Sequence, residues 1–246
     1  MSRIEARFEV RYPGFALDVT LDLPGRGVTA LFGPSGCGKT TCLRAMAGLL
    51  HAPGGRLRVQ GEVWQDDHRF VPTHRRPLGY VAQDAALFPH LTVRGNVEYG
   101  MTRVPAAQRK VSIDQAVALL GIDALMGRRP DALSGGERQR VAMARALATS
   151  PRLIIAGEPT GQLDSLNAEA MMSLIASLVH ERGVSAIVST HDPRTAAHAD
   201  RVLEIHDGHL GRRHGRHNLP RGGPMQPGLW LGLWRLWRPG GLGPGQ

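Results

Sequence analysis

The sequence predicts an α/β fold with a mostly parallel core sheet, an N-terminal antiparallel β subdomain and a helical lobe. Short apolar runs alternate with helical patterns between residues 28 and 205, which is typical of parallel strands joined by crossover helices. A glycine-rich run at 33–41 lies between one such strand and one such helix. At 246 residues, the chain is long enough to bury a large core.

The elements follow from hydrophobic periodicity. Strands are expected at 4–10 and 15–23, then at 28–32, with a hairpin at 56–59 and 62–64 and a short strand at 78–81. Helical patterns cover about 93–125, forming a lobe at about 84–150, and another helix opens near 135. A strand at 153–156, a helix at 165–182 and strands at 185–189 and 201–205 complete the predicted domain, residues 1–210.

The last 36 residues differ from the rest in composition. Six arginines and no acidic residue lie in 211–246, so removing them from the net charge of +9 leaves +3 for the first 210 residues. Glycine and proline make up 15 of these 36 positions, which predicts a disordered tail. Its Trp/Arg pattern at 229–238 leaves open a contact with a membrane interface. Because the basic residues gather in this tail, no nucleic-acid partner is expected.

The totals exclude several other classes. No apolar run of about 18 residues is present, which predicts no membrane span, and the N-terminus shows no signal-peptide pattern. Cys37 and Cys42 are the only cysteines, one in the loop at 33–41 and one on the following helix, so neither a disulfide framework nor a four-ligand metal site is expected. This usage suits a reducing cytosol.

The run at 33–41 matches the P-loop pattern G-x-x-x-x-G-K-[ST] in its required context of strand, loop and helix. Its glycines let backbone N–H groups face a phosphate, and the helix N-terminus adds a positive dipole end. We expect Lys39 to reach the β- and γ-phosphates and the Thr40 hydroxyl to bind Mg²⁺. The predicted nucleotide-binding residues are Gly33, Pro34, Ser35, Gly36, Cys37, Gly38, Lys39, Thr40 and Thr41.

Three polar residues lie just past the ends of predicted strands, where a parallel sheet presents its catalytic groups. Glu158 can orient a water for attack on the γ-phosphate, and His191 can hydrogen-bond the phosphate oxygens. Gln83 can meet Mg²⁺ or the attacking water. Each is an ordinary loop residue taken alone, but three of them downstream of a P-loop predict a catalytic site.

A second phosphate-binding surface is predicted at Ser134-Gly135-Gly136, where a hydroxyl and backbone amides begin a helix. One nucleotide does not need two such surfaces from one chain. We therefore expect a head-to-tail pair in which each chain completes its partner's site.

In this order, the motifs resemble the ATP-binding subunit of ATP-binding-cassette (ABC) transporters over about residues 4–210. The resemblance implies a P-loop NTPase that uses ATP and Mg²⁺ and forms a homodimer around two ATP molecules. Ser134 and Gly136, within the signature that also holds Gly135 and Glu137, would then reach the partner's γ-phosphate. Asp164 matches the loop between the two sites. Tyr12 lies near the family's adenine-stacking aromatic, and local packing is an equally good interpretation of it.

One position departs from the family pattern. The family's hydrophobic strand ends in Asp-Glu, whereas this one ends Gly157-Glu158. The aspartate usually holds Mg²⁺ through water, so its loss predicts weaker Mg²⁺ binding and slower hydrolysis, with nucleotide binding kept. A hydrolysis-impaired regulatory subunit therefore stays an alternative.

Two stretches bear on the transported substrate. Residues 75–101 look like the ATPases of molybdate importers, without the further ligand-sensing domain that those usually carry, whereas 158–164 is similar to lipoprotein-export ATPases. Import of molybdate or a related oxyanion is the preferred interpretation. The resemblance implies integral membrane permease subunits, indirectly a periplasmic substrate-binding protein, and a peripheral position on the cytoplasmic face of the inner membrane. Soluble ABC ATPases of DNA repair or translation typically have two cassettes or a coiled-coil insertion, neither of which is seen here.

Overall fold

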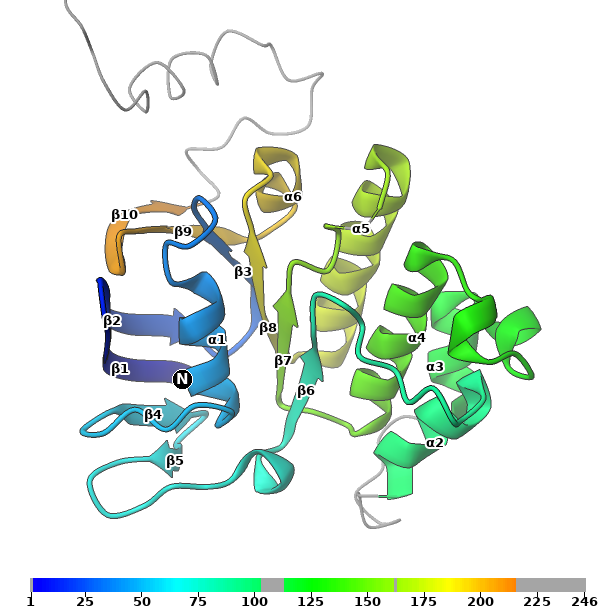
Figure 1. The fold of residues 1–246 in the computed structure, drawn as a ribbon, viewed down its shortest axis with the longest axis horizontal. Helices are drawn as coiled ribbons and strands as arrows, with labels where there is room; N and C mark the ends of the chain where they lie inside the picture. The colour runs from blue at the N-terminus through cyan, green and yellow to red at the C-terminus, as the bar shows by residue number, and fades with distance from the viewer. Residues whose placement is uncertain (1, 103–112, 162, 216–246) are drawn as a thin grey trace, which may run out of the picture.

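The computed structural model describes residues 2–102, 113–161 and 163–215, and its strands form one mixed sheet (Figure 1). The strand order is β5-β4-β1-β2-β10-β9-β3-β8-β7-β6. The strands are β1 (Arg3–Tyr12), β2 (Phe15–Pro24), β3 (Gly27–Phe32), β4 (Arg56–Val59), β5 (Glu62–Gln65), β6 (Leu78–Val81), β7 (Leu153–Gly157), β8 (Ser185–Thr190), β9 (Arg201–His206) and β10 (His209–Gly215). The helices are α1 (Lys39–Ala47), α2 (Val93–Thr102), α3 (Ile113–Leu120), α4 (Gly135–Ala148), α5 (Ser165–Arg182) and α6 (Pro193–Ala197).

The parallel half of the sheet carries the site. Strands β9, β3, β8, β7 and β6 run parallel as neighbours. The register pairs Phe32 with Thr190 and Gly157 with Ser189. The carboxyl ends of these strands therefore meet at one edge, which brings together the loops that follow β3, β6, β7 and β8.

Alternate residues of the central strands face two separate cores. Along β7, Ile154 and Ala156 belong to a core shared with α4 and α5, whereas Leu153 and Ile155 belong to a core shared with α1 and the N-terminal strands. Strand β8 alternates in the same way. Because the sheet is covered on both faces, its central strands read as continuous apolar runs in the sequence.

The antiparallel half matches the expected N-terminal subdomain. Strands β1 and β2 form a long hairpin, β4 pairs with the far side of β1, and β5 follows β4. Trp64 of β5 is fully buried in the core that also holds α1. The fold class is confirmed: an α/β P-loop NTPase sheet joined to antiparallel strands.

The helical lobe follows the predicted periodicity, whereas the C-terminal part differs from the prediction. Helices α2, α3 and α4 lie together at the end of the sheet beyond β6 (Figure 1), as the periodicity indicated. Strand β10 was not predicted, and the expected boundary at residue 210 falls inside it. Helix α6 was also missed. The Trp/Arg segment at 229–238 lies outside the described residues.

Among the helices of residues 2–102, 113–161 and 163–215, none has the length and apolar character needed to cross a membrane.

Candidate functional site

Helix α1 begins without a side-chain cap. Its N-cap is Gly38, at φ +109°, and no acidic residue lies in its first turn. A side chain is strained at this φ, and a Cβ at Gly38 would also lie 2.9 Å from Leu17 Cδ1 and 2.9 Å from Phe15 Cζ, so glycine is favoured here. Helices α4, α5 and α6, by contrast, are capped by Ser134, Asp164 and Asp192. The first amides of α1 therefore keep their hydrogens for an external acceptor.

Lys39 is the first residue of α1, and its side chain folds back against the loop that precedes the helix. It is only 4% exposed, and its Nζ donates to the carbonyl oxygens of Gly33 at 2.7 Å and Pro34 at 2.8 Å. Its third contact is Cys37 Sγ, at 3.9 Å. Within the described part of the chain these partners are all neutral, so the ammonium charge is buried without a compensating carboxylate. Such a charge favours an anion nearby.

The three residues predicted at the strand ends come together. Glu158 Oε2 accepts from Gln83 Nε2 at 3.3 Å, and Glu158 Oε1 lies 3.5 Å from His191 Nδ1. The Glu158 side chain is 18% exposed and that of His191 is 56% exposed. The carboxylate is thus held between an amide and an imidazole with one side open to solvent, the arrangement a general base requires.

Two further residues, Ser189 and Gln139, hold the backbone of Glu158 and of Gln83 in place. The Glu158 N–H donates to Ser189 O and to Ser189 Oγ, both at 3.1 Å. Glu158 has φ +46°, a strained value for a residue with a side chain. Gln139 Nε2 donates to the Gln83 carbonyl at 2.7 Å and ties the lobe to the site. Ser189 belongs to no motif, and Gln139, the last residue of the Leu133–Gln139 signature, was not expected to contact Gln83, so only the three-dimensional structure reveals these contacts.

The donor set for a divalent cation is small. Thr40 is exposed on the first turn of α1, and Gln83 offers an amide oxygen. No cluster of three or more His, Cys, Asp or Glu side chains suited to a metal occurs in the described ranges. A Cβ at Gly157 would lie 3.8 Å from Gln83 N and from Val81 O, an ordinary contact distance, so the backbone does not itself require glycine here. These residues fit Mg²⁺ only when phosphate oxygens and water complete its shell.

The predicted second phosphate-binding surface forms a capping box. Ser134 Oγ accepts from the Glu137 N–H at 3.2 Å, and Glu137 Oε2 accepts from the Ser134 N–H at 2.7 Å. The hydrogen bond from the Ser134 N–H, and after it that from the Ser134 side chain, holds the pKa of Glu137 below its ordinary value. The Glu137 amide is therefore already used, which leaves the amides of Gly135 and Gly136 for an external acceptor. This surface lies on α4, apart from α1 in the fold (Figure 1).

Tyr12 and Asp164 each have a local structural role. Tyr12 is 45% exposed, and its ring stacks on Phe15 with centroids 6.4 Å apart. Asp164 caps α5 by accepting from the Asn167 N–H at 3.0 Å. Their assignments to adenine and to a dimer loop stay predictions.

A cleft of about 250 Å³ opens beside Glu158 and His191. It is lined by Glu158, Thr160, Gly161, Leu163, Ala168, Thr190, His191, Asp192 and Arg194. Its walls come from the turns after β7 and β8 and from α5 and α6, so both turns that carry the catalytic candidates line the same cleft.

Comparison with known proteins agrees with this geometry. A family model described as ABC transporter matches residues 17–161. The molybdenum import ATP-binding protein ModC of Thiobacillus denitrificans is 55% identical over 206 residues, covering 83% of this chain and 57% of that protein. ModC 1 of Azotobacter vinelandii is 53% identical over 210 residues, covering 84% of this chain and 58% of its own length. The chain thus spans little more than half the length of these relatives.

Among solved structures, a similar fold is found in the ATP-binding cassette MJ0796, in a dimeric post-hydrolysis state bound to ADP and Pi. It aligns with a TM-score of 0.73 at 28% identity, covering 91% of this chain and all of that one.

Proposed function

The chain belongs to the ABC transporter family, and from this premise we propose that it binds and hydrolyses ATP as the energy-supplying subunit of an oxyanion importer. The observation that carries the proposal is the start of α1: an uncapped helix N-terminus beside the buried and uncompensated ammonium of Lys39. Both features favour a polyphosphate.

Hydrolysis follows from the groups at the strand ends. Glu158 is placed to accept a proton from a water, while His191, 3.5 Å away, orients the carboxylate and can donate to a phosphate oxygen. Gln83 fixes the other carboxylate oxygen. Bound Mg²⁺ would neutralise phosphate charge, with Thr40 as its protein ligand and Gln83 beside it.

The capped but hydroxyl-bearing start of α4 supports a shared site. Helix α4 lies apart from α1 within one chain (Figure 1), so Ser134, Gly135 and Gly136 at the start of α4 would serve the ATP held by a second copy. The dimeric cassette with ADP and Pi supports this homodimer.

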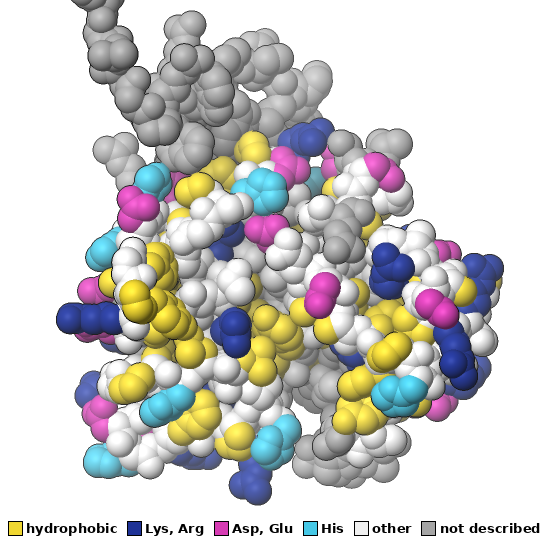
Figure 2. All heavy atoms as spheres, in the orientation of Figure 1, with side chains coloured by type: hydrophobic (Ala, Val, Ile, Leu, Met, Phe, Trp, Pro, Cys, Tyr) yellow, Lys and Arg dark blue, Asp and Glu magenta, His cyan; other side chains and the backbone are white. Residues whose placement is uncertain are grey.

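The proposed substrate and partners are inferred from the named relatives. Both ModC proteins are named for molybdenum import, and we extend molybdate or a related oxyanion to this chain. Figure 2 shows hydrophobic side chains gathered over part of the helical lobe. Tyr99 of α2 and Leu119 of α3 are large hydrophobic residues that this lobe exposes. Such a patch suits docking to permease subunits at the cytoplasmic face of the membrane, with a periplasmic binding protein acting indirectly.

A second candidate is favoured by Gly157. Without the carboxylate at that place, the chain would bind nucleotide and hydrolyse it very slowly as a regulatory subunit. The turnover number of the purified protein separates the two candidates.

The test compares ATP binding and phosphate release for four proteins. We expect Lys39→Ala to lose ATP affinity, and Glu158→Gln to bind ATP while losing roughly 10²–10⁴-fold in rate. Glu5→Gln, an exposed glutamate on β1, is the matched control. Parental hydrolysis by Glu158→Gln would refute the assignment. Molybdate uptake by cells lacking their own importer ATPase, restored by the parent but not by Glu158→Gln, tests the substrate.

A further inference from the structure

Two buried threonine hydroxyls connect the turn that carries Glu158 to the turn that carries His191. Thr160 lies two residues after Glu158, is 8% exposed, and its Oγ1 is 3.2 Å from Thr195 Oγ1. Thr195 lies in α6 and is 3% exposed. The two threonines are far apart in sequence, so this contact joins segments that follow different strands.

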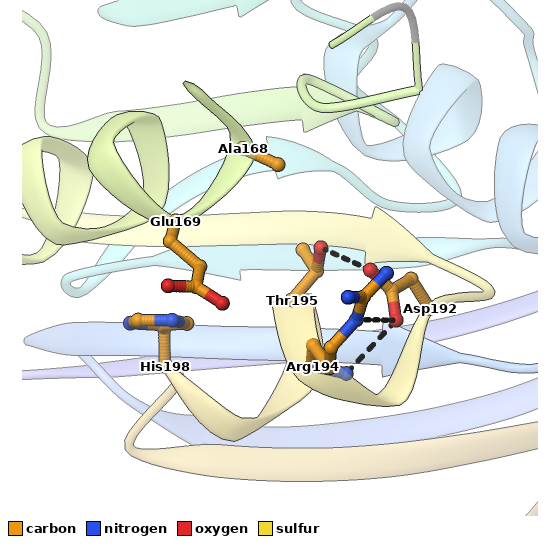
Figure 3. Close-up of a pocket in the computed structure, with 6 residues that line it drawn as sticks. All are labelled: Ala168, Glu169, Asp192, Arg194, Thr195 and His198. Atoms are coloured by element: carbon orange, nitrogen blue, oxygen red, sulfur yellow. Dashed lines mark hydrogen bonds and ion pairs between the residues drawn. The ribbon is translucent and has the colours of Figure 1, made fainter. Parts of the chain in front are cut away.

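The direction of these hydrogen bonds follows from the donors available. Thr195 Oγ1 donates to Asp192 Oδ2 at 3.3 Å, a bond drawn in Figure 3. A hydroxyl has only one hydrogen, so Thr195 must accept from Thr160. The series of hydrogen bonds therefore runs from the Thr160 hydroxyl to the Thr195 hydroxyl and on to the Asp192 carboxylate.

Each end of this hydrogen-bonded series is connected to a predicted catalytic residue, His191 at one end and Glu158 at the other. Asp192 directly follows His191, and its N–H donates to Thr190 Oγ1 at 3.0 Å. Its other oxygen, Oδ1, accepts from the Arg194 N–H at 3.0 Å (Figure 3). On the opposite side, the Gly161 N–H donates to the Glu158 carbonyl at 3.0 Å, so Thr160 sits inside the turn that sets the Glu158 backbone.

We propose that Thr195 is a positioning residue that locks these two turns together and thereby holds His191 beside Glu158. The proposal deepens the ATPase function and rests on it. Thr195 touches neither nucleotide nor water in this role. It acts by fixing the 3.5 Å separation between His191 Nδ1 and Glu158 Oε1. Misplacement of a catalytic group by about 1 Å costs up to roughly 100-fold in rate, so loss of the Thr160–Thr195 contact should lower kcat measurably.

Thr195→Val keeps the shape of the side chain and removes the hydroxyl. We expect kcat to fall roughly 10- to 100-fold while ATP affinity changes less than about 2-fold. Thr195→Ser, which keeps the hydroxyl, should restore kcat. Thr160→Val should also lower kcat, and Thr160→Val/Thr195→Val should be no slower than Thr195→Val, because both act on one contact. The control is Thr149→Val, whose hydroxyl donates to Ala146 O at 2.7 Å at the end of α4.

A second readout does not depend on catalysis. Amide hydrogen exchange at Gly161 and Leu163 should speed up in Thr195→Val and stay at the parental rate in Thr195→Ser. The proposal would be overturned if amides in Thr195→Val exchanged at the parental rate, or if the kcat losses of the two valine variants were additive. It would also be overturned if Thr195→Val lost ATP affinity by the same factor as kcat. If the parent itself neither binds nor hydrolyses ATP, the proposed function fails, and the exchange experiment still decides whether the lock exists.

Discussion

Replacing Gly157 with aspartate tests whether the chain lacks one Mg²⁺-positioning group. The structure accommodates the change: a Cβ would meet nothing nearer than Gln83 N and Val81 O, both at 3.8 Å, an ordinary van der Waals distance. Gly157 ends β7 next to Glu158 and pairs in register with Ser189, so the new carboxylate would lie at the edge where the phosphates are expected.

The expected size of the effect comes from the role of such a group. A carboxylate that holds a metal through water typically contributes about 10–100-fold in metal affinity, or roughly 1.4–2.7 kcal/mol. We therefore expect Gly157→Asp to lower the Mg²⁺ concentration for half-maximal ATP hydrolysis by that factor, and to raise the rate at limiting Mg²⁺. At saturating Mg²⁺ the gain should be smaller.

The assay is phosphate release measured across a Mg²⁺ titration at fixed ATP. Gly157→Asn, which has nearly the same volume and no charge, is the matched control and should leave the half-saturating concentration near that of the parent. A Gly157→Asp protein that unfolds at the parental Tm but shows an unchanged Mg²⁺ dependence would refute the reasoning.

Three further predictions concern stability and reactivity. Hydrogen bonds from Ser134 lower the pKa of Glu137, so this group stabilises the fold above its unfolded pKa of about 4.3 and the benefit is lost as pH falls through the lowered value. The difference in unfolding free energy between the parent and Glu137→Gln, measured in urea, should therefore be largest near pH 7 and shrink in acid; a constant difference would contradict this. Arg76 is 5% exposed and donates to three buried carbonyl oxygens, so Arg76→Leu should lower the free energy of unfolding by roughly 2–4 kcal/mol in urea, and a loss below about 0.5 kcal/mol would contradict that role. Burial raises the pKa of the Cys42 thiol to about 12, and the Cys37 side chain is itself only 4% exposed. A thiol reagent at pH 8 should therefore label neither cysteine until the protein is denatured.

The sequence could predict the site because its key residues follow strands. Parallel strands bring their carboxyl ends to one edge, so Gln83, Glu158 and His191 could be assigned to one place without coordinates. The uncapped start of α1 was equally predictable, because glycine stands where a capping side chain would be.

Contacts between distant segments could not be predicted in this way. The Thr160–Thr195 pair depends on how two turns pack, and neither threonine is part of a periodic pattern. Strand β10 was missed because its polar, glycine-containing sequence does not alternate apolar and polar residues. It forms a strand by pairing with β9, not through a high β-propensity of its own residues. Helix α6 has only five residues, too few for periodicity to show.

The most direct test of the account asks whether two chains share each ATP site. Lys39→Ala disables the P-loop of its own chain. Ser134→Asp keeps the cap of α4, since aspartate caps as well as serine, but places a negative charge where the partner's γ-phosphate would approach. Each variant alone should be inactive, because both sites of its dimer are damaged. Mixing the two variants should restore ATP hydrolysis, because one site of the mixed dimer combines an intact Lys39 with an intact Ser134. An inactive mixture, or parental hydrolysis by Ser134→Asp alone, would contradict the shared site.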